Sequence, residues 1–140
     1  MTTTGPRLVS ILRQGPYLIA SIHTALDDTQ MTDFQHDLVE RIGRDRSRGV
    51  VIDVAALDVL DSFGTRTLRT IAEVARLRGA VTVVVGIRPD VAFAMVALGM
   101  DTGPLRTALD LEEGLDVLDR LVAPGRSTSR SRSTPGSRTA

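Results

Sequence analysis

The stretch Gly49-Val-Val-Ile-Asp-Val-Ala-Ala-Leu-Asp-Val-Leu-Asp-Ser-Phe-Gly-Thr65 decides the fold. Residues 50–54 form an apolar block rich in β-branched side chains, which is typical of a strand buried on both faces. After this block the apolar residues recur at helical intervals, at Phe63, Leu68, Ile71, Val74 and Leu77. The stretch therefore predicts a buried strand, a short connection and a helix that begins at Ser62.

Four polar side chains of this stretch are candidates for a functional site: Asp53, Asp58, Asp61 and Ser62. Asp53 interrupts the buried strand, and an ionised carboxylate there needs partners, for which the nearby helix start is a natural source. Ser62 has two interpretations. It can cap the helix by accepting a backbone N–H bond, or it can be a hydroxyl for modification, because a helix N-terminus tolerates a phosphate. The pattern alone favours the cap.

Composition indicates a single domain of 140 residues with a mostly aliphatic core, since the chain has three Phe, one Tyr and no Trp. So few aromatic residues argue against a stacking surface for single-stranded nucleic acid. All 17 basic residues are Arg, and four of them follow Pro124, where there is no acid. The remaining 13 Arg face 17 acids, a net charge of −4, which also argues against nucleic acid as a partner.

The absence of Cys and Lys from the sequence excludes several kinds of chemistry. Disulfides, cysteine-based zinc sites and lysine-dependent phosphate loops are ruled out. Asp27, Asp28 and Asp33 are explained as helix-cap and first-turn acids, so we expect neither a metal nor a cofactor. No apolar run approaches the length of a membrane span and no signal peptide is recognised, so we expect a cytoplasmic protein without a membrane partner.

The chain before the deciding stretch predicts a hairpin and a helix. Residues 8–12 and 17–22 are two short strands around the turn signal Gln14-Gly15-Pro16. Asp27 or Asp28 then caps a helix with Met31, Phe34, Leu38 and Ile42 on its apolar face. The helix ends between residues 43 and 48, where Arg44, Arg46 and Arg48 suit the negative end of its dipole.

The chain after the deciding stretch continues the alternation. Gly79 ends the helix, residues 80–87 form a second buried strand, and Pro89 opens a short helix that Gly99 ends. Residues 104–108 are an edge-strand candidate, and Asp110 caps a last helix up to residue 122. The fold class is therefore α/β, a mostly parallel mixed sheet with an N-terminal antiparallel hairpin and about four helices. Residues 1–6 and the Arg/Ser-rich residues 123–140 are expected to be disordered, leaving 7–122 as the domain.

Several of these segments together resemble the STAS domain, the module of anti-sigma-factor antagonists. The segments are Val-Val-Ile-Asp-Val at 50–54, Asp-Ser-Phe at 61–63, Gly-Ile-Arg-Pro-Asp-Val-Ala at 86–92 and Ala-Leu-Asp-Leu-Glu-Glu-Gly-Leu at 108–115. Leu-Ile-Ala-Ser-Ile-His at 18–23, Leu-Asp-Asp at 26–28 and Phe-Gln-His-Asp-Leu at 34–38 fit the small stressosome antagonists, the RsbS type, within this family. The resemblance covers residues 7–122.

The resemblance implies a non-catalytic protein that is phosphorylated on Ser62. Asp53, Asp58, Asp61, Phe63 and Gly64 would surround that serine and form the kinase interface, although Gly64 and Arg66 depart from the RsbS-type pattern. The implied partners are an RsbT-type serine kinase, an RsbR-type sensor STAS protein and a phosphatase acting on Ser62. These proteins would form a large oligomeric assembly that controls stress signalling or a sigma factor.

Other functions stay open at this point. The chain could antagonise an anti-sigma-factor kinase directly, or it could be a shell subunit in which Ser62 is only a cap. A small hydrolase could use Ser62 with Asp53, or Ser62 with His23, although no nucleophile-elbow motif supports it. Thr65 and Thr67 are further candidates for modification.

Overall fold

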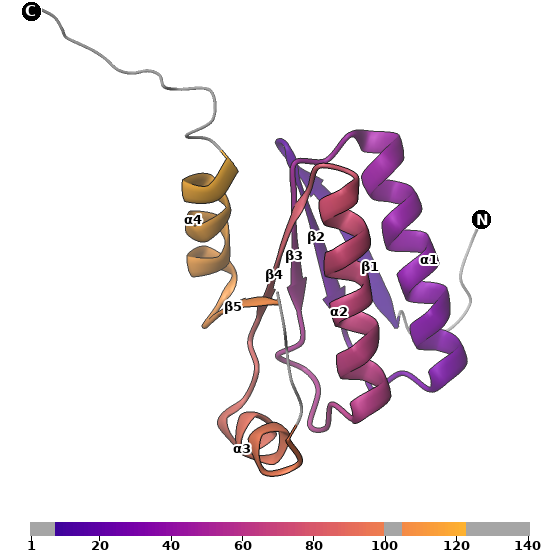
Figure 1. Ribbon diagram of the computed structural model, residues 1–140, viewed down its shortest axis with the longest axis vertical. Coiled ribbons are helices and arrows are strands. Elements are labelled where there is room, and N and C mark those ends of the chain that lie inside the picture. Colours follow the sequence, from indigo (N-terminus) through magenta and orange to yellow (C-terminus); the bar gives the residue numbers. More distant parts are fainter. Residues whose placement is uncertain (1–7, 100–104, 123–140) are drawn as a thin grey trace, which may run out of the picture.

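The computed structural model describes residues 8–99 and 105–122 as a single sheet with helices packed on it (Figure 1). The elements follow in the order β1 (Val9–Gln14), β2 (Tyr17–Ile22), α1 (Asp28–Asp45), β3 (Gly49–Asp53), α2 (Ser62–Leu77), β4 (Val81–Val85), α3 (Pro89–Ala97), β5 (Arg106–Ala108) and α4 (Leu111–Val122). The predicted order of strands and helices is confirmed. Residues 1–6 and 123–140, predicted to be disordered, lie outside the described residues, as does residue 104 of the predicted edge strand.

The sheet has the strand order β1-β2-β3-β4-β5. β1 and β2 are antiparallel and joined by a tight turn, in which Gln14 pairs with Tyr17 and Gly15 has a φ of 60°. All the other pairs are parallel, with Ser21, Asp53 and Val85 at corresponding positions of β2, β3 and β4. The predicted mixed sheet with an N-terminal hairpin is therefore confirmed.

α1 begins at a complete capping box. The Asp27 carboxylate accepts the Gln30 N–H at 2.7 Å, and the Gln30 side chain accepts the Asp27 N–H at 2.9 Å. Of the two acids that could cap this helix, Asp27 does so and Asp28 lies in the first turn, where an acid favours the helix dipole.

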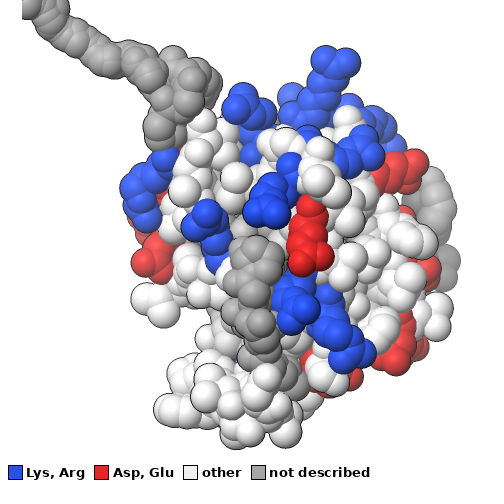
Figure 2. All heavy atoms as spheres, in the orientation of Figure 1, with Lys and Arg blue, Asp and Glu red and all other residues white. Residues whose placement is uncertain are grey.

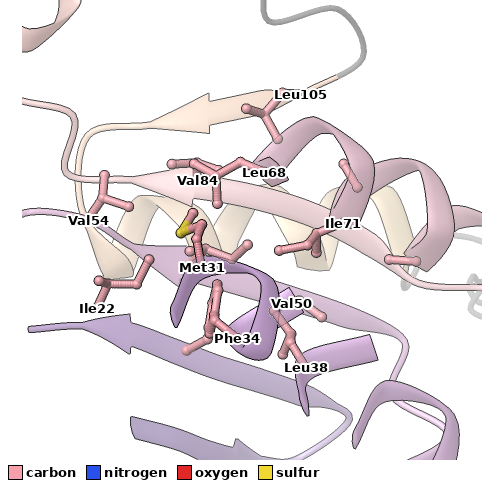
Figure 3. Packing of buried hydrophobic residues seen from close by; sticks show 14 of the residues in the cluster. Ile22, Met31, Phe34, Leu38, Val50, Val54, Leu68, Ile71, Val84 and Leu105 are labelled. Carbon is pink, nitrogen blue, oxygen red and sulfur yellow. The ribbon is translucent and has the colours of Figure 1, made fainter. Parts of the chain in front are cut away.

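Helices cover both faces of the sheet. α1 and α2 lie on one face, and Figure 3 shows their side chains meeting those of the strands in the main core. α4 covers β3, β4 and β5 on the other face, while α3 lies beyond one end of the sheet (Figure 1). Fully buried aliphatic residues dominate the main core, namely Leu18, Ile22, Leu38, Ile42, Val50, Ile52, Leu68, Ile71 and Val84.

Candidate functional site

Ser62 is the first residue of α2 and is exposed. The connection between Asp53 at the end of β3 and Ser62 carries the chain around the carboxyl edge of the parallel strands. In open α/β sheets this edge is where ligands and partners are usually bound. The predicted helix start at Ser62 is confirmed, and it places the serine on the rim of the sheet.

The residue that caps α2 is Asp61, not Ser62. Asp61 has the extended backbone of an N-cap, with φ −82° and ψ 179°, and its carboxylate accepts the Gly64 N–H at 2.7 Å. The interpretation of Ser62 as the cap is therefore wrong by one residue, because Asp61 is an equally good capping residue and precedes it. The Ser62 hydroxyl is left outside the capping interaction.

The other two hydroxyls at the start of α2 are engaged by the helix itself. Thr65 Oγ1 donates to the Asp61 carbonyl at 3.0 Å, and Thr67 Oγ1 donates to the Phe63 carbonyl at 2.9 Å. Both threonines are buried, whereas Ser62 is exposed. Among these three hydroxyls, Ser62 is thus the one that a modifying enzyme can reach.

Asp53 does not share a site with Ser62 in the way the sequence suggested. It is half-buried at the last position of β3, and its carboxylate accepts the Ala55 N–H at 2.9 Å. The sequence predicted a partner for the Asp53 carboxylate at the start of α2. Its partner is instead the backbone N–H of Ala55, two residues further along the chain. Such a local bond is a common turn interaction of Asp, so Asp53 shapes the beginning of the connection.

Asp58 lies in the middle of the connection and forms an ion pair with Arg88, the residue that precedes α3. Both side chains are substantially exposed, so the pair contributes little to stability. Its effect is positional, because it ties the Ser62 connection to the start of α3. Arg88 could not be recognised as the partner of Asp58 from sequence patterns, since thirty residues separate the two.

A groove of about 480 Å³ lies between this connection and α3, and we call it the Ser62 groove. Its lining residues are Asp58, Val59, Leu60, Asp61, Ser62, Asp90, Val91, Ala94 and Leu98. Two large apolar side chains of this lining stand exposed, with exposed fractions of 67% for Val59 and 71% for Leu98, and α3 also exposes Phe93 (76%) and Val96 (78%) on its other faces. An exposed apolar rim beside a polar centre is typical of a protein-binding surface. The contribution of α3 was missing from the sequence prediction.

Phe63 and Gly64 lie on the other side of the connection. They line a smaller recess of about 100 Å³, together with Leu26 of the β2–α1 loop and Asp28 at the start of α1. Gly64 is buried, and a Cβ atom there would lie 3.0 Å from the Leu60 side chain and 3.2 Å from Asp61 Oδ1. Glycine at this position therefore leaves room for the Asp61 cap.

The described residues give no support to catalytic or metal chemistry around Ser62. His23 Nε2 lies 3.0 Å from Ser10 Oγ on the edge strand β1, so its hydrogen-bond partner is Ser10. Residues 8–99 and 105–122 contain no group of three His, Asp or Glu side chains that could hold a metal ion. Within the same ranges, no helix has both the length and the apolar character needed to cross a bilayer.

The roles of Asp61 and Ser62 can be separated by substitution. Asp61→Ala removes the cap and is expected to lower the free energy of unfolding by about 1 kcal/mol, within a range of about 0.5–2. Ser62→Ala, one residue later, is expected to change it by less than about 0.5 kcal/mol. Urea denaturation followed by circular dichroism measures both values. Equal losses for the two variants would mean that Ser62 also takes part in capping.

Three comparisons place the chain among known proteins. A family model described as "STAS domain" matches residues 9–114. The chain is 37% identical to a solved structure of RsbS from Moorella thermoacetica, a serine-to-glutamate variant, covering 82% of this chain and 97% of that one with a TM-score of 0.71. It is 35% identical to a chain of a structure described as "Molecular architecture of the stressosome, a signal integration and transduction hub", covering 80% and 97% with a TM-score of 0.64.

A curated relative is the RsbT co-antagonist protein RsbRA of Bacillus subtilis (strain 168). It is 29% identical over 101 residues, which make up 69% of this chain and 37% of that protein. The chain therefore spans little more than a third of this relative's length. The family model, by contrast, covers well over half of the chain and all of the elements from β1 to the start of α4. The chain belongs to the STAS domain family.

Proposed function

We propose that this chain is a non-catalytic, cytoplasmic STAS protein of the RsbS type that holds a switch serine kinase and releases it when Ser62 is phosphorylated. The observation that carries the proposal is the exposed Ser62 hydroxyl, which Asp61 leaves outside the helix cap and which lines a groove with an apolar rim. The similarity to RsbS and to a stressosome chain supports this type of regulator.

The partners follow from the same relatives. We infer an RsbT-type kinase bound at the Ser62 groove, an RsbR-type sensor STAS protein that co-assembles with this chain, and a phosphatase that resets Ser62. RsbRA is known as an RsbT co-antagonist protein, which supports a kinase of this type as the common partner. The large assembly would control stress signalling or a sigma factor through the released kinase.

The physical basis of the switch is the charge around the groove. Asp58, Asp61 and Asp90 already line it, and a phosphate on Ser62 adds a charge of about −1.5 to −2 beside them. A partner that buries the neutral serine would then have to desolvate a dianion among carboxylates. A change of about 1–3 kcal/mol in binding free energy corresponds to an affinity about 5- to 150-fold weaker.

The positions of the side chains argue against the competing hydrolase hypothesis. Asp53 accepts a hydrogen bond from Ala55 N and is absent from the lining of the Ser62 groove, and His23 is hydrogen-bonded to Ser10. Among the described residues, therefore, neither of the two groups expected to activate Ser62 is seen beside it. A serine hydroxyl without an adjacent base is a weak nucleophile but a suitable acceptor for a kinase.

The test is phosphopeptide mass spectrometry after incubation with ATP, the RsbT-type kinase and the sensor STAS protein. We expect one phosphate on Ser62, none in Ser62→Ala, and unchanged labelling in Thr70→Ala, which removes another exposed hydroxyl of α2. Biolayer interferometry with immobilised kinase is then expected to give about 5- to 150-fold weaker binding for the phosphorylated protein. Undiminished labelling of Ser62→Ala would reject the site, and equal affinity of the two forms would reject the switch.

A further inference from the structure

Several exposed arginines gather at one end of the parallel strands. We call Arg13, Arg44, Arg46, Arg48 and Arg78 the basic pole. They come from the end of β1, the end of α1, the start of β3 and the end of α2. Backbone bonds hold these segments together, from Arg48 N to the Pro16 carbonyl at 2.8 Å and from Val81 N to the Arg48 carbonyl at 3.1 Å. Figure 2 shows several arginines along the upper edge of the molecule, with others further down the same face.

Two acids near this region already have partners. Asp119 of α4 accepts from the Tyr17 hydroxyl, at the start of β2, at 2.6 Å. Asp45, at the end of α1, accepts from Arg41 Nε at 2.9 Å and lies 4.0 Å from Arg44 Nε. The Arg78 guanidinium lies directly over Gly43, where a Cβ atom would come within 2.0 Å of it, so the end of α2 adds its charge to the end of α1. The basic pole is thus one continuous surface.

The opposite end of the strands is acidic. We call Asp27, Asp28, Asp58, Asp61 and Asp90 the Ser62 pole, because they lie at the starts of α1, α2 and α3 and in the connection between β3 and α2. All five are exposed, and three of them line the Ser62 groove. Two arginines lie on the same surface: Arg88, which is paired with Asp58, and Arg66, one turn after Ser62.

Helix dipoles explain part of this division, since acids favour helix N-termini and bases favour C-termini. They do not explain Arg13, which lies on a strand. They account for the charge of Arg46 but not for its backbone, which has φ 52° and ψ 44° and makes it the one residue other than glycine with a positive φ among the described residues. Glycine is the ordinary residue at such a helix end, so an arginine there points to a use for its side chain.

We propose that the basic pole binds the Ser62 pole of a second copy of this chain, in a head-to-tail contact. Each chain carries both surfaces at opposite ends, so the contact is heterologous and can extend to further copies. Opposite charges steer the two surfaces together and fix their orientation. A phosphate on Ser62 would strengthen the contact between the two copies and weaken the contact with the kinase. This consequence, unlike the contact itself, rests on the proposed function.

The test is sedimentation velocity of the purified full chain alone, over a range of protein concentrations. At low salt we expect the weight-average mass to rise with concentration beyond that of a dimer. In 1 M salt, where the Debye length is about 3 Å, we expect the monomer. The double variant Arg46→Glu/Arg48→Glu, and separately Asp58→Arg/Asp90→Arg, are each expected to weaken self-association by at least about tenfold, because like charges then face each other.

A mixture of the two double variants provides the decisive measurement. Their reversed surfaces complement each other, so an equimolar mixture is expected to associate although each variant alone does not. The control, Arg106→Glu, reverses the charge of an exposed β5 residue outside both poles and is expected to associate like the wild type.

A wild-type protein that stays monomeric at low salt would overturn the proposal, as would association that the control reduces as much as the pole variants do. Failure of the mixture to associate, with both variants folded by circular dichroism, would also overturn it. No kinase is present in these measurements. Their outcome therefore does not depend on whether a kinase recognises Ser62, as the proposed function requires.

Discussion

Replacing Gly86 with alanine is expected to lower the free energy of unfolding by about 2–5 kcal/mol, through backbone strain and overpacking together. Gly86 follows β4 with a φ of 84°. A Cβ atom there would lie 2.8 Å from the Ala55 Cβ and 3.0 Å from the Ala55 N and Cα atoms. Backbone bonds from Val54 N to the Val85 carbonyl and from Gly86 N to the Leu109 carbonyl hold both sides in place. The collision would therefore displace the connection that leads to Ser62.

Gly79→Ala is the matched control for this substitution. Gly79 has nearly the same φ, 87°, but a Cβ atom there would meet nothing within 4 Å. It should therefore show the backbone strain alone, about 1–2 kcal/mol. Urea denaturation of both variants measures the difference, which belongs to the contact with Ala55. Equal losses would show that this close approach does not constrain the connection.

Replacing Leu118 with alanine is expected to lower the free energy of unfolding by about 2–5 kcal/mol. Leu118 is fully buried and is the central α4 residue in the smaller core, where it lies with Val51, Val83 and Val122. The close fit around it limits relaxation, since a Cβ atom on Gly49 would lie 2.9 Å from its side chain. α4 has twelve residues, too few for a stable isolated helix, so this packing holds it on the sheet.

Leu121→Ala on the same helix is the control, because Leu121 is 42% exposed and its loss should change stability by less than about 1 kcal/mol. Hydrogen exchange adds a second measurement. In Leu118→Ala we expect the amides of α4 to lose protection before those of α1, which belongs to the larger core on the other face. Simultaneous loss in both helices would show that the two layers unfold as one unit.

The sequence predicted the elements of this fold because each has a strong local signal. The β-branched block at 50–54, the helical spacing after Phe63 and the glycine at position 79 act within a few residues of one another. Gly79 does end α2 with a positive φ, and Pro89 does open α3. Where the deciding interaction is local, pattern and structure agree.

The candidate site was predicted less completely because it depends on contacts between distant segments. The Asp58–Arg88 pair and the wall of the Ser62 groove formed by α3 join residues about thirty positions apart, which no periodicity reveals. The choice between Asp61 and Ser62 as the cap failed for another reason. Both residue types cap helices well, so only the backbone at Asp61 distinguishes them.

The adjacency of Asp61 and Ser62 has a consequence for how this protein can evolve. The Asp61 side chain caps α2, whereas the Ser62 hydroxyl takes no part in the cap. A mutation can therefore change the stability of the helix or the signalling residue separately. A descendant protein with threonine, glutamate or alanine in place of Ser62 would have an altered or permanently fixed signalling output. It would still be well folded and would not be degraded faster. A substitution of Asp61, by contrast, would lower the stability of the protein and hence its abundance in the cell, whatever its effect on signalling.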